Sequence, residues 1–121
     1  MKRDMDLVRK ILLEVEKNPE SDALIEISIE GYSEDNIAYH VALLVEAGLL
    51  INFFNNGKMV PVAVAAHMTW AGHDFLDACR DEGRWQKAKS IIGEQVKSAP
   101  FDVLKSVLVK LIDLQVHQAF T

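Results

Sequence analysis

Apolar residues recur with the period of an α-helix in five segments of the chain. The first segment runs from Asp4 to Lys17 and is ended by Asn18-Pro19, because the residue before a proline disfavours helical geometry. The second segment starts at Ser33, a good helix cap, and ends at Gly48. The predicted apolar faces are Met5, Val8, Ile11, Leu12 and Val15 in the first helix, and Ile37, Val41, Leu44 and Val45 in the second.

Three more helices are predicted in the second half of the chain. Thr69 is a good cap for the third helix, which ends near Gly83, and the fourth follows it directly. The last helix begins after Pro100. The predicted apolar faces are Phe75, Leu76 and Cys79 in the third helix, Trp85, Ala88, Ile91, Ile92 and Val96 in the fourth, and Phe101, Leu104, Val107, Leu108, Leu111, Ile112 and Leu114 in the last.

Alternating apolar and polar residues predict short strands between the first three helices. Residues 24–29 place three isoleucines on one side of a strand that ends before Gly31. Residues 49–54 and 59–68 flank the turn at residues 55–58, and together these segments predict a β-hairpin. Pro61 places its strand at a sheet edge, because proline has no amide hydrogen to donate.

The predicted order of elements gives a mainly α fold with a small β-hairpin. Helix, strand, helix, hairpin and helix resemble a winged-helix domain, in which the helix before the hairpin usually enters the DNA major groove. We expect residues 1–97 to form this domain with an appended helix, and residues 98–121 to form an interaction or dimerisation helix of the same domain. The span between Pro19 and Tyr32 is too short for a strand and a further helix, which argues against standard DNA docking.

Three segments also resemble an uncharacterised bacterial and phage-associated family, domain of unknown function 2513. They are residues 1–11, the pair Tyr39-His40, and residues 69–77 with the sequence Thr-Trp-Ala-Gly-His-Asp-Phe-Leu-Asp. The resemblance covers most of the chain and is most specific from Thr69 to Leu76. It implies a shared fold and not an activity, because the same fold can carry unrelated functions.

Composition is that of one globular domain, with 50% hydrophobic and 26% charged residues in 121. The chain has no apolar run long enough to cross a bilayer and no apolar stretch at its start, so we expect a cytoplasmic protein. The single cysteine, Cys79, has no disulfide partner within the chain. The net charge is −5, and residues 18–57 contain no lysine or arginine. This charge distribution disfavours nucleic acid around the second helix.

Two functions are therefore compatible with the second helix. Its outward face is predicted to carry Asp35, Tyr39, Ala42, Leu43 and Glu46, without a basic side chain. A DNA-binding regulator would need basic side chains of the N-terminal helix, Lys58, and Arg80 or Arg84 to converge on one surface, with Asn36 near the start of the second helix as a further contact. A protein-interaction adaptor needs only the patch around Tyr39 and Leu43.

Other candidate sites are weaker. Arg80, Arg84, Lys87, Lys89 and Lys97, with Trp70 and Trp85 nearby in sequence, indicate either a phosphate-binding patch or a solvated helix face beside core tryptophans. His73 and Asp77 have a spacing that suits two metal ligands, but no third ligand accompanies them, and a capping or packing histidine is favoured. The chain contains no phosphate loop, nucleophile elbow or zinc motif. We expect neither an enzyme nor a bound cofactor or metal.

The last helix also predicts an oligomer. Its apolar face is wider than a small monomer easily covers. We expect a homodimer, with Leu104, Leu108 and Leu111 as the contact residues.

Overall fold

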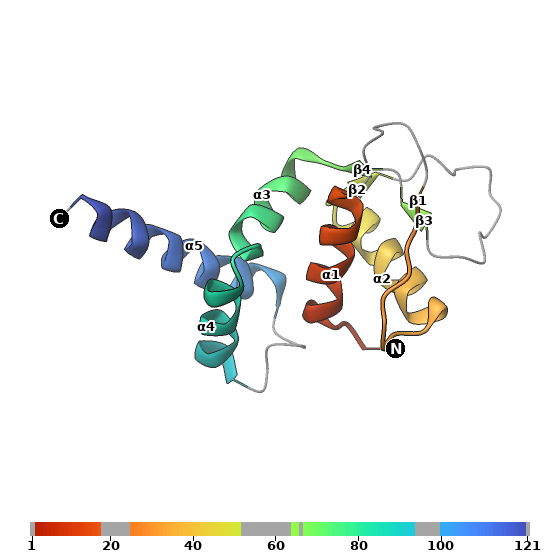
Figure 1. Ribbon diagram of the computed structural model, residues 1–121, viewed down its shortest axis with the longest axis horizontal. Helices are drawn as coiled ribbons and strands as arrows, with labels where there is room; N and C mark the ends of the chain where they lie inside the picture. Colours follow the sequence, from red (N-terminus) through yellow and green to blue (C-terminus); the bar gives the residue numbers. More distant parts are fainter. Residues whose placement is uncertain (1, 18–24, 52–63, 66, 94–99, 121) are drawn as a thin grey trace.

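The computed structural model describes residues 2–17, 25–51, 64–65, 67–93 and 100–120 (Figure 1). In these ranges the chain is mainly helical with short antiparallel strand pairs, which confirms the predicted mainly α fold with a small β-hairpin. The helices are α1 (Met5–Glu16), α2 (Glu34–Glu46), α3 (Trp70–Cys79), α4 (Glu82–Ile92) and α5 (Phe101–Ala119), and the strands are β1 (Ile25–Glu26), β2 (Leu50–Ile51), β3 (Val64–Ala65) and β4 (His67–Met68).

Side-chain caps start four of the helices. The Asp4 carboxylate accepts the backbone N–H groups of Asp6 and Leu7 at the start of α1. The predicted caps Ser33 and Thr69 accept N–H groups at the starts of α2 and α3. The helix predicted to run to near Gly83 instead ends at Cys79, because the Asp81 carboxylate accepts the Arg84 N–H and starts α4.

The strands form two short antiparallel pairs. β2 pairs with β4, Leu50 opposite Met68, so the two segments predicted to form a hairpin do pair, although a turn at residues 55–58 would have placed Leu50 opposite residue 63. β3 pairs instead with β1, Ile25 opposite Ala65. The segment predicted as one returning strand therefore contributes to both pairs. Residues 27–29, expected to continue the first strand, adopt no strand, and no helix lies in the described residues 25–33 before α2. The predicted turn at residues 55–58 and Pro61 lie outside the described ranges.

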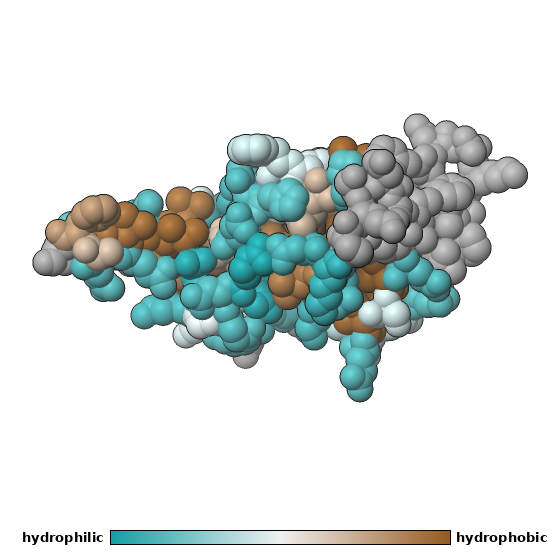
Figure 2. Space-filling view, turned by 45° about the horizontal axis from the view of Figure 1, so that its top comes forward, coloured by the Kyte–Doolittle hydropathy of each residue, from teal (hydrophilic) through white to brown (hydrophobic). Residues whose placement is uncertain are grey.

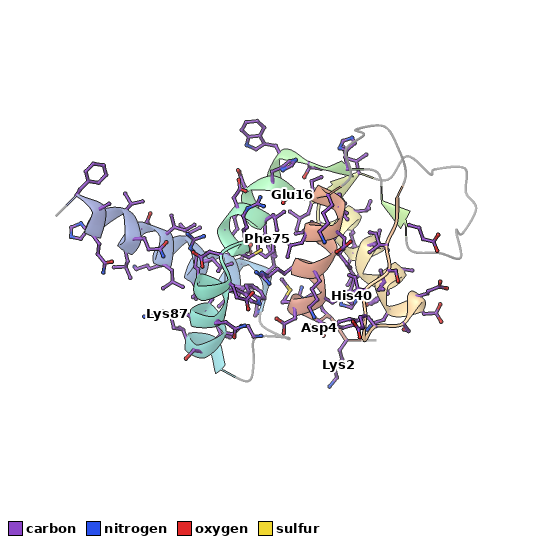
Figure 3. All side chains as sticks on the ribbon, in the orientation of Figure 1. Lys2, Asp4, Glu16, His40, Phe75 and Lys87 are labelled. Carbon is purple, nitrogen blue, oxygen red and sulfur yellow. The ribbon has the colours of Figure 1, made fainter. Side chains whose placement is uncertain are left out.

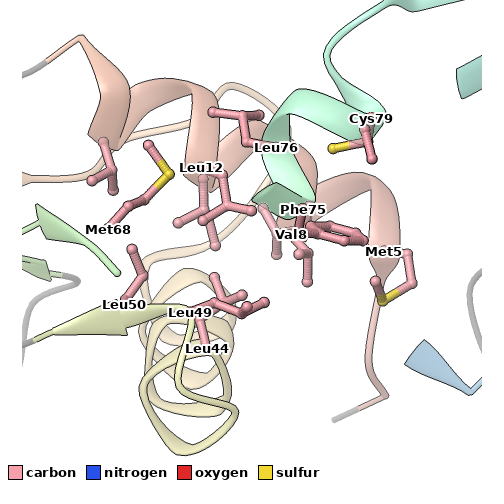
Figure 4. Close-up of a cluster of buried hydrophobic side chains, with 14 of the residues drawn as sticks. Met5, Val8, Leu12, Leu44, Leu49, Leu50, Met68, Phe75, Leu76 and Cys79 are labelled. Carbon is pink, nitrogen blue, oxygen red and sulfur yellow. The ribbon is translucent and has the colours of Figure 1, made fainter. Parts of the chain in front are cut away.

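The core gathers around α1, which packs between α2 and α3 (Figure 4). Its apolar face is enclosed, as predicted, and it meets the buried faces of the other helices. Burial of these side chains is the main favourable contribution to folding. The buried set is Met5, Leu7, Val8, Ile11, Leu12, Val15, Ile27, Ile37, Val41, Leu44, Leu49, Leu50, Met68, Phe75, Leu76, Ala78, Cys79, Trp85, Ala88, Leu104 and Leu108.

Polar contacts fix α4 against the start of α1. The indole N–H of the buried Trp85 donates to the Asp6 carboxylate at 2.9 Å, and the Lys89 ammonium lies 3.1 Å from the same carboxylate. On the same helix α1, Arg9 donates to the Cys79 carbonyl at 2.7 Å and pairs with Glu82 at 2.9 Å. Trp85 is thus a core residue, as one of the two interpretations of the sequence expected.

The final helix belongs to the core over only part of its length. α5 packs against α3 and α4, and its end then projects beyond them (Figure 1). Leu104 and Leu108 are fully buried by the chain itself. The predicted dimer contact through these two residues is therefore wrong, because α3 and α4 already enclose them.

Candidate functional site

The outward side of α2 carries the predicted protein-docking residues. Ser33 caps the helix, and its inward residues, among them Ile37, Val41 and Leu44, are buried. This orientation leaves the opposite side in solvent, where Tyr39 is 36% exposed. We call this surface the α2 face. It consists of the half-buried Leu43 and the exposed residues Asp35, Tyr39, Ala42 and Glu46.

A groove continues the α2 face toward the start of α1. It has a volume of about 300 Å³ and lies where α1, α2 and the first residue of α5 meet. Leu43 forms part of its wall, and Arg3 and Glu46 are the charged groups at its lining. The other lining residues are Met5, Val8, Leu44, Ala47, Leu49 and Phe101. An apolar groove beside an exposed tyrosine suits the apolar side chains of a protein partner.

The residues proposed for DNA contact do not form one basic surface in the described part of the chain. Asn36 is half-buried, and its Oδ1 is enclosed without a hydrogen-bond partner among the described residues. Lys58 lies outside the described ranges. Arg80 forms a bidentate ion pair with Glu16. One of its guanidinium nitrogens also forms an ion pair with Asp77 at 2.8 Å. These contacts lower the pKa of the Glu16 carboxyl and raise that of Arg80.

Arg84 is also occupied by structural contacts. One guanidinium nitrogen donates to the carbonyls of Asp77 and Ala78 at the end of α3, and another donates to Gln115 Oε1 on α5 at 2.9 Å. Arg84 thus joins α3, α4 and α5. Of the other predicted patch residues, Lys89 pairs with Asp6, Lys87 is exposed, and Lys97 lies outside the described ranges.

His40 is the one buried polar residue in the described core (Figure 3). Its Nε2 accepts the backbone N–H of Asp4 at 2.8 Å, and its Nδ1 lies 2.9 Å from the Asn36 carbonyl. An imidazole with one accepting and one donating nitrogen satisfies both bonds. The nearby Tyr32 hydroxyl donates to Asp4, and burial, followed by the charge of Asp4, raises the pKa of Tyr32. This histidine connects α2 to the cap of α1. A capping or packing histidine was expected from the sequence, but the contact with Asp4 was not.

The start of α3 is held firmly against the end of α2. Thr69 donates through its hydroxyl to the Gly48 carbonyl and through its backbone N–H to the Leu49 carbonyl. Gly72 packs so closely that a Cβ placed there would lie 2.1 Å from the Leu49 carbonyl oxygen. Thr69 therefore joins the residues just before β2 to α3, and the His73 side chain is exposed, so it is not the packing histidine expected from the sequence.

Comparison with known proteins assigns the chain to a family. The family model described as "Hypothetical protein (DUF2513)" matches residues 2–98. The chain belongs to the DUF2513 family. An uncharacterised protein of Haemophilus influenzae is 32% identical over 115 residues, which cover 93% of this chain and 96% of the relative. No solved structure gives a significant match.

The DUF2513 segment from Thr69 to Asp77 divides into two kinds of residue. Thr69 caps the helix and Gly72 permits close packing, while Phe75 and Leu76 fill the core. The remaining members lie in solvent, including Trp70, which is 84% exposed. One tryptophan of this DUF2513 protein is therefore a core residue, and the other is a surface residue.

The candidate chemical groups are arranged as follows. Asp77 pairs with Arg80, and among the described residues no group of three or more His, Cys, Asp or Glu side chains could hold a metal ion. Cys79 is buried, and its burial raises the pKa of the thiol to about 12. A protonated, enclosed thiol is a poor nucleophile.

No helix in the described part of the DUF2513 protein is long and apolar enough to cross a membrane.

Proposed function

We propose that this DUF2513 protein is a non-catalytic, winged-helix-like adaptor that binds a partner protein through the α2 face and the adjoining groove. The observation that carries the proposal is the composition of this surface. It combines the exposed ring of Tyr39 and the half-buried Leu43 with acidic side chains, and α2 contains no lysine or arginine. Aromatic and apolar side chains with a charged rim are typical of protein interfaces.

The winged-helix part of the proposal is supported by the strand pairing. The strand before α2 and the strand after it both find partners in the segment that leads into α3. In a winged helix the hairpin likewise follows the helix that usually enters the DNA major groove.

DNA binding is the less favoured alternative. Phosphate contacts require basic groups that can leave their intramolecular partners. Arg80 and Arg84 hold α1, α3, α4 and α5 together through the contacts described above. Using them for DNA would give up those contacts.

The non-catalytic part of the proposal is supported by the state of the candidate nucleophile. Cys79 lies inside the core, so a substrate could reach its sulfur only after the core opened. Among the described residues, no histidine or cysteine lines the apolar groove.

A photo-crosslinking amino acid at Tyr39 tests the adaptor. In the native host we expect a discrete crosslinked protein, and its yield should fall at least about five-fold when Leu43→Asp disrupts the groove wall. The same probe at Lys87, which is exposed on α4, is the matched control. Equal crosslinking from both positions, or a Leu43→Asp variant that crosslinks normally, would contradict the proposal.

A fluorescence-anisotropy titration with generic duplex DNA tests the alternative. The adaptor predicts no binding at low salt. Micromolar binding that weakens steeply with added salt would favour the regulator instead.

We also propose that the adaptor is a homodimer formed through the projecting end of α5. Apolar side chains remain exposed there, and Figure 2 shows them as a continuous hydrophobic surface at the end of the molecule. Large exposed apolar patches mark interaction sites. Of the predicted contact residues, Leu111 keeps this role. The exposed large apolar residues in this part of the chain are Val109, Leu114, Val116 and Phe120.

Sedimentation equilibrium tests the dimer. We expect the parent to be dimeric and a Leu114→Asp, Phe120→Asp variant to be monomeric at the same concentration, because a buried charge without a partner opposes association. Asp102→Lys, a charge change on the exposed first turn of α5, should leave the dimer intact. A monomeric parent would overturn this part of the proposal.

A further inference from the structure

The outward side of α3 presents a second surface, on a different helix from the α2 face. Trp70, His73, Asp74 and Asp77 are all exposed, and their spacing of three, one and three residues places them on one side of the helix. Trp70 is 84% exposed, far more than any other tryptophan or tyrosine among the described residues. Tryptophan contributes large apolar area, so its full exposure is costly unless a partner covers it.

The backbone at Trp70 is fixed by contacts within the chain. It is the first residue of α3, and the preceding Thr69 is bonded to the Gly48 and Leu49 carbonyls. Gly72 packs tightly against Leu49 in the same turn. On a fixed backbone a tryptophan has only two side-chain torsions to restrict, so it loses little conformational freedom on binding, and such residues are efficient interface anchors.

The charges around Trp70 are predominantly negative. Asp74 lies one turn further along α3, and helix side chains lean toward the N-terminus, so its carboxylate is directed back toward Trp70. Asp74 has no hydrogen-bond or ion-pair partner among the described residues. Asp77 and Glu16 share the single guanidinium of Arg80. This side of the molecule therefore has one uncompensated carboxylate beside an exposed indole and a net excess of negative charge.

We propose that Trp70 and Asp74 form a binding site for an arginine side chain of a partner protein. Tryptophan is the best aromatic ring for a cation–π contact, and a guanidinium can stack on the ring while donating to a carboxylate at its edge. Arginine satisfies both groups at once, because its planar fork carries donors and its face is weakly hydrated. Lysine offers the charge without the planar stacking surface.

The site is tested by NMR with short peptides. The chain has two tryptophans, so two indole N–H signals are expected. Trp85 is buried and donates to Asp6, which makes its signal an internal control for the exposed Trp70. The probes are acetyl-Gly-Arg-Gly-Arg-Gly-amide and the same peptide with citrulline, which has the shape of arginine without its charge. We expect the Trp70 signal to shift saturably with the arginine peptide, at millimolar concentration, while the Trp85 signal stays in place.

Variants separate the site from general electrostatic attraction. Asp74→Asn should weaken binding of the arginine peptide about five-fold, whereas Asp102→Asn, an exposed carboxylate on α5, should leave it unchanged. Trp70→Phe should weaken binding and keep the unfolding temperature of the parent, because the side chain lies in solvent. Equal affinity for the arginine and citrulline peptides, or no saturable shift up to about 10 mM, would overturn the proposal. So would a Trp70 signal that moves when the protein alone is diluted, because a second copy would then cover the ring.

Discussion

The two halves of α5 differ in what covers them, although both are rich in apolar residues. Leu104 and Leu108 in the first half are fully buried by α3 and α4. In the second half Leu114 is 52% exposed, and Phe120, directly after the helix, is 86% exposed. Apolar periodicity thus shows that a helix has a face to bury, but it does not show whether the same chain or another covers it.

α3 repeats this contrast between opposite sides of one helix. Gly72, Phe75 and Leu76 face the core, whereas Trp70 lies in solvent only two residues from Gly72. If burial within the chain separates the two kinds of residue, substitutions of buried residues should destabilise the fold. Matched substitutions of solvent-exposed residues should affect only association.

The largest expected effect comes from the buried half of α5. Leu108→Ala should lower the free energy of unfolding by roughly 2–5 kcal/mol, because it leaves a cavity in a closely packed core. Leu114→Ala, the same change in the exposed half, should alter it by less than about 0.5 kcal/mol at concentrations where the protein is monomeric. Urea unfolding of both variants measures the difference. Similar losses would mean that the second half of α5 is also part of the fold.

Gly72→Ala should have the next largest effect. The new methyl group would overlap the Leu49 carbonyl oxygen, and the backbone would have to move, at a cost of roughly 1–3 kcal/mol. Gly83→Ala is the matched control, because its nearest atom is the side-chain Oδ1 of Asp81, 3.3 Å away. Thermal unfolding should show a lower midpoint for the first variant alone. A neutral Gly72→Ala would contradict the close packing of α3 on the end of α2.

The smallest effect should come from the ion pair that joins α1 to the end of α3. Arg80 holds the pKa of Glu16 below its ordinary value in the folded protein. The Glu16 carboxyl is therefore a stronger acid in the folded protein than in the unfolded chain. The stability that it contributes is present above its pKa in the unfolded chain and is lost as the pH falls through its pKa in the folded protein. Glu16→Gln should therefore reduce stability by less than about 1 kcal/mol at neutral pH, because the pair is partly exposed.

A pH series measures this last effect. The difference between parent and Glu16→Gln should vanish progressively as the pH falls below the ordinary pKa of glutamate. Glu34→Gln, at the exposed start of α2, provides a comparison on another helix. A difference that persists in acid would mean that Glu16 acts through packing and not through its charge.

Several features of the fold were predictable because they depend on neighbouring residues. The caps Ser33 and Thr69, the apolar face of α1 and the pairing of β2 with β4 follow from local pattern. The apolar face of α2 does so too, except for Val45, which was predicted to point inward and is 36% exposed. The break between α3 and α4 was predicted, but near Gly83 and not at Arg80 and Asp81, where the Asp81 side chain caps α4. The pairing of β3 with β1 joins segments far apart in sequence, so local pattern gave no indication of it.

For the candidate site, sequence placed Tyr39 on the exposed side of α2, Leu43 beside it and no basic residue between them. It could not place Arg80 and Arg84, because their partners Glu16 and Gln115 come from distant parts of the chain. The role of His40 depends in the same way on the distant N–H of Asp4.

The sequence by itself determined which segments are helical, where most of them begin, and that the middle of the chain is acidic, because these properties depend on residues within a few positions of one another. Only the tertiary structure decided that Trp85 is enclosed while Trp70 is open, and that Leu108 is covered while Leu114 is not. Burial is set by which distant segments pack together, and two residues of the same type with similar neighbours can therefore end on opposite sides of that boundary.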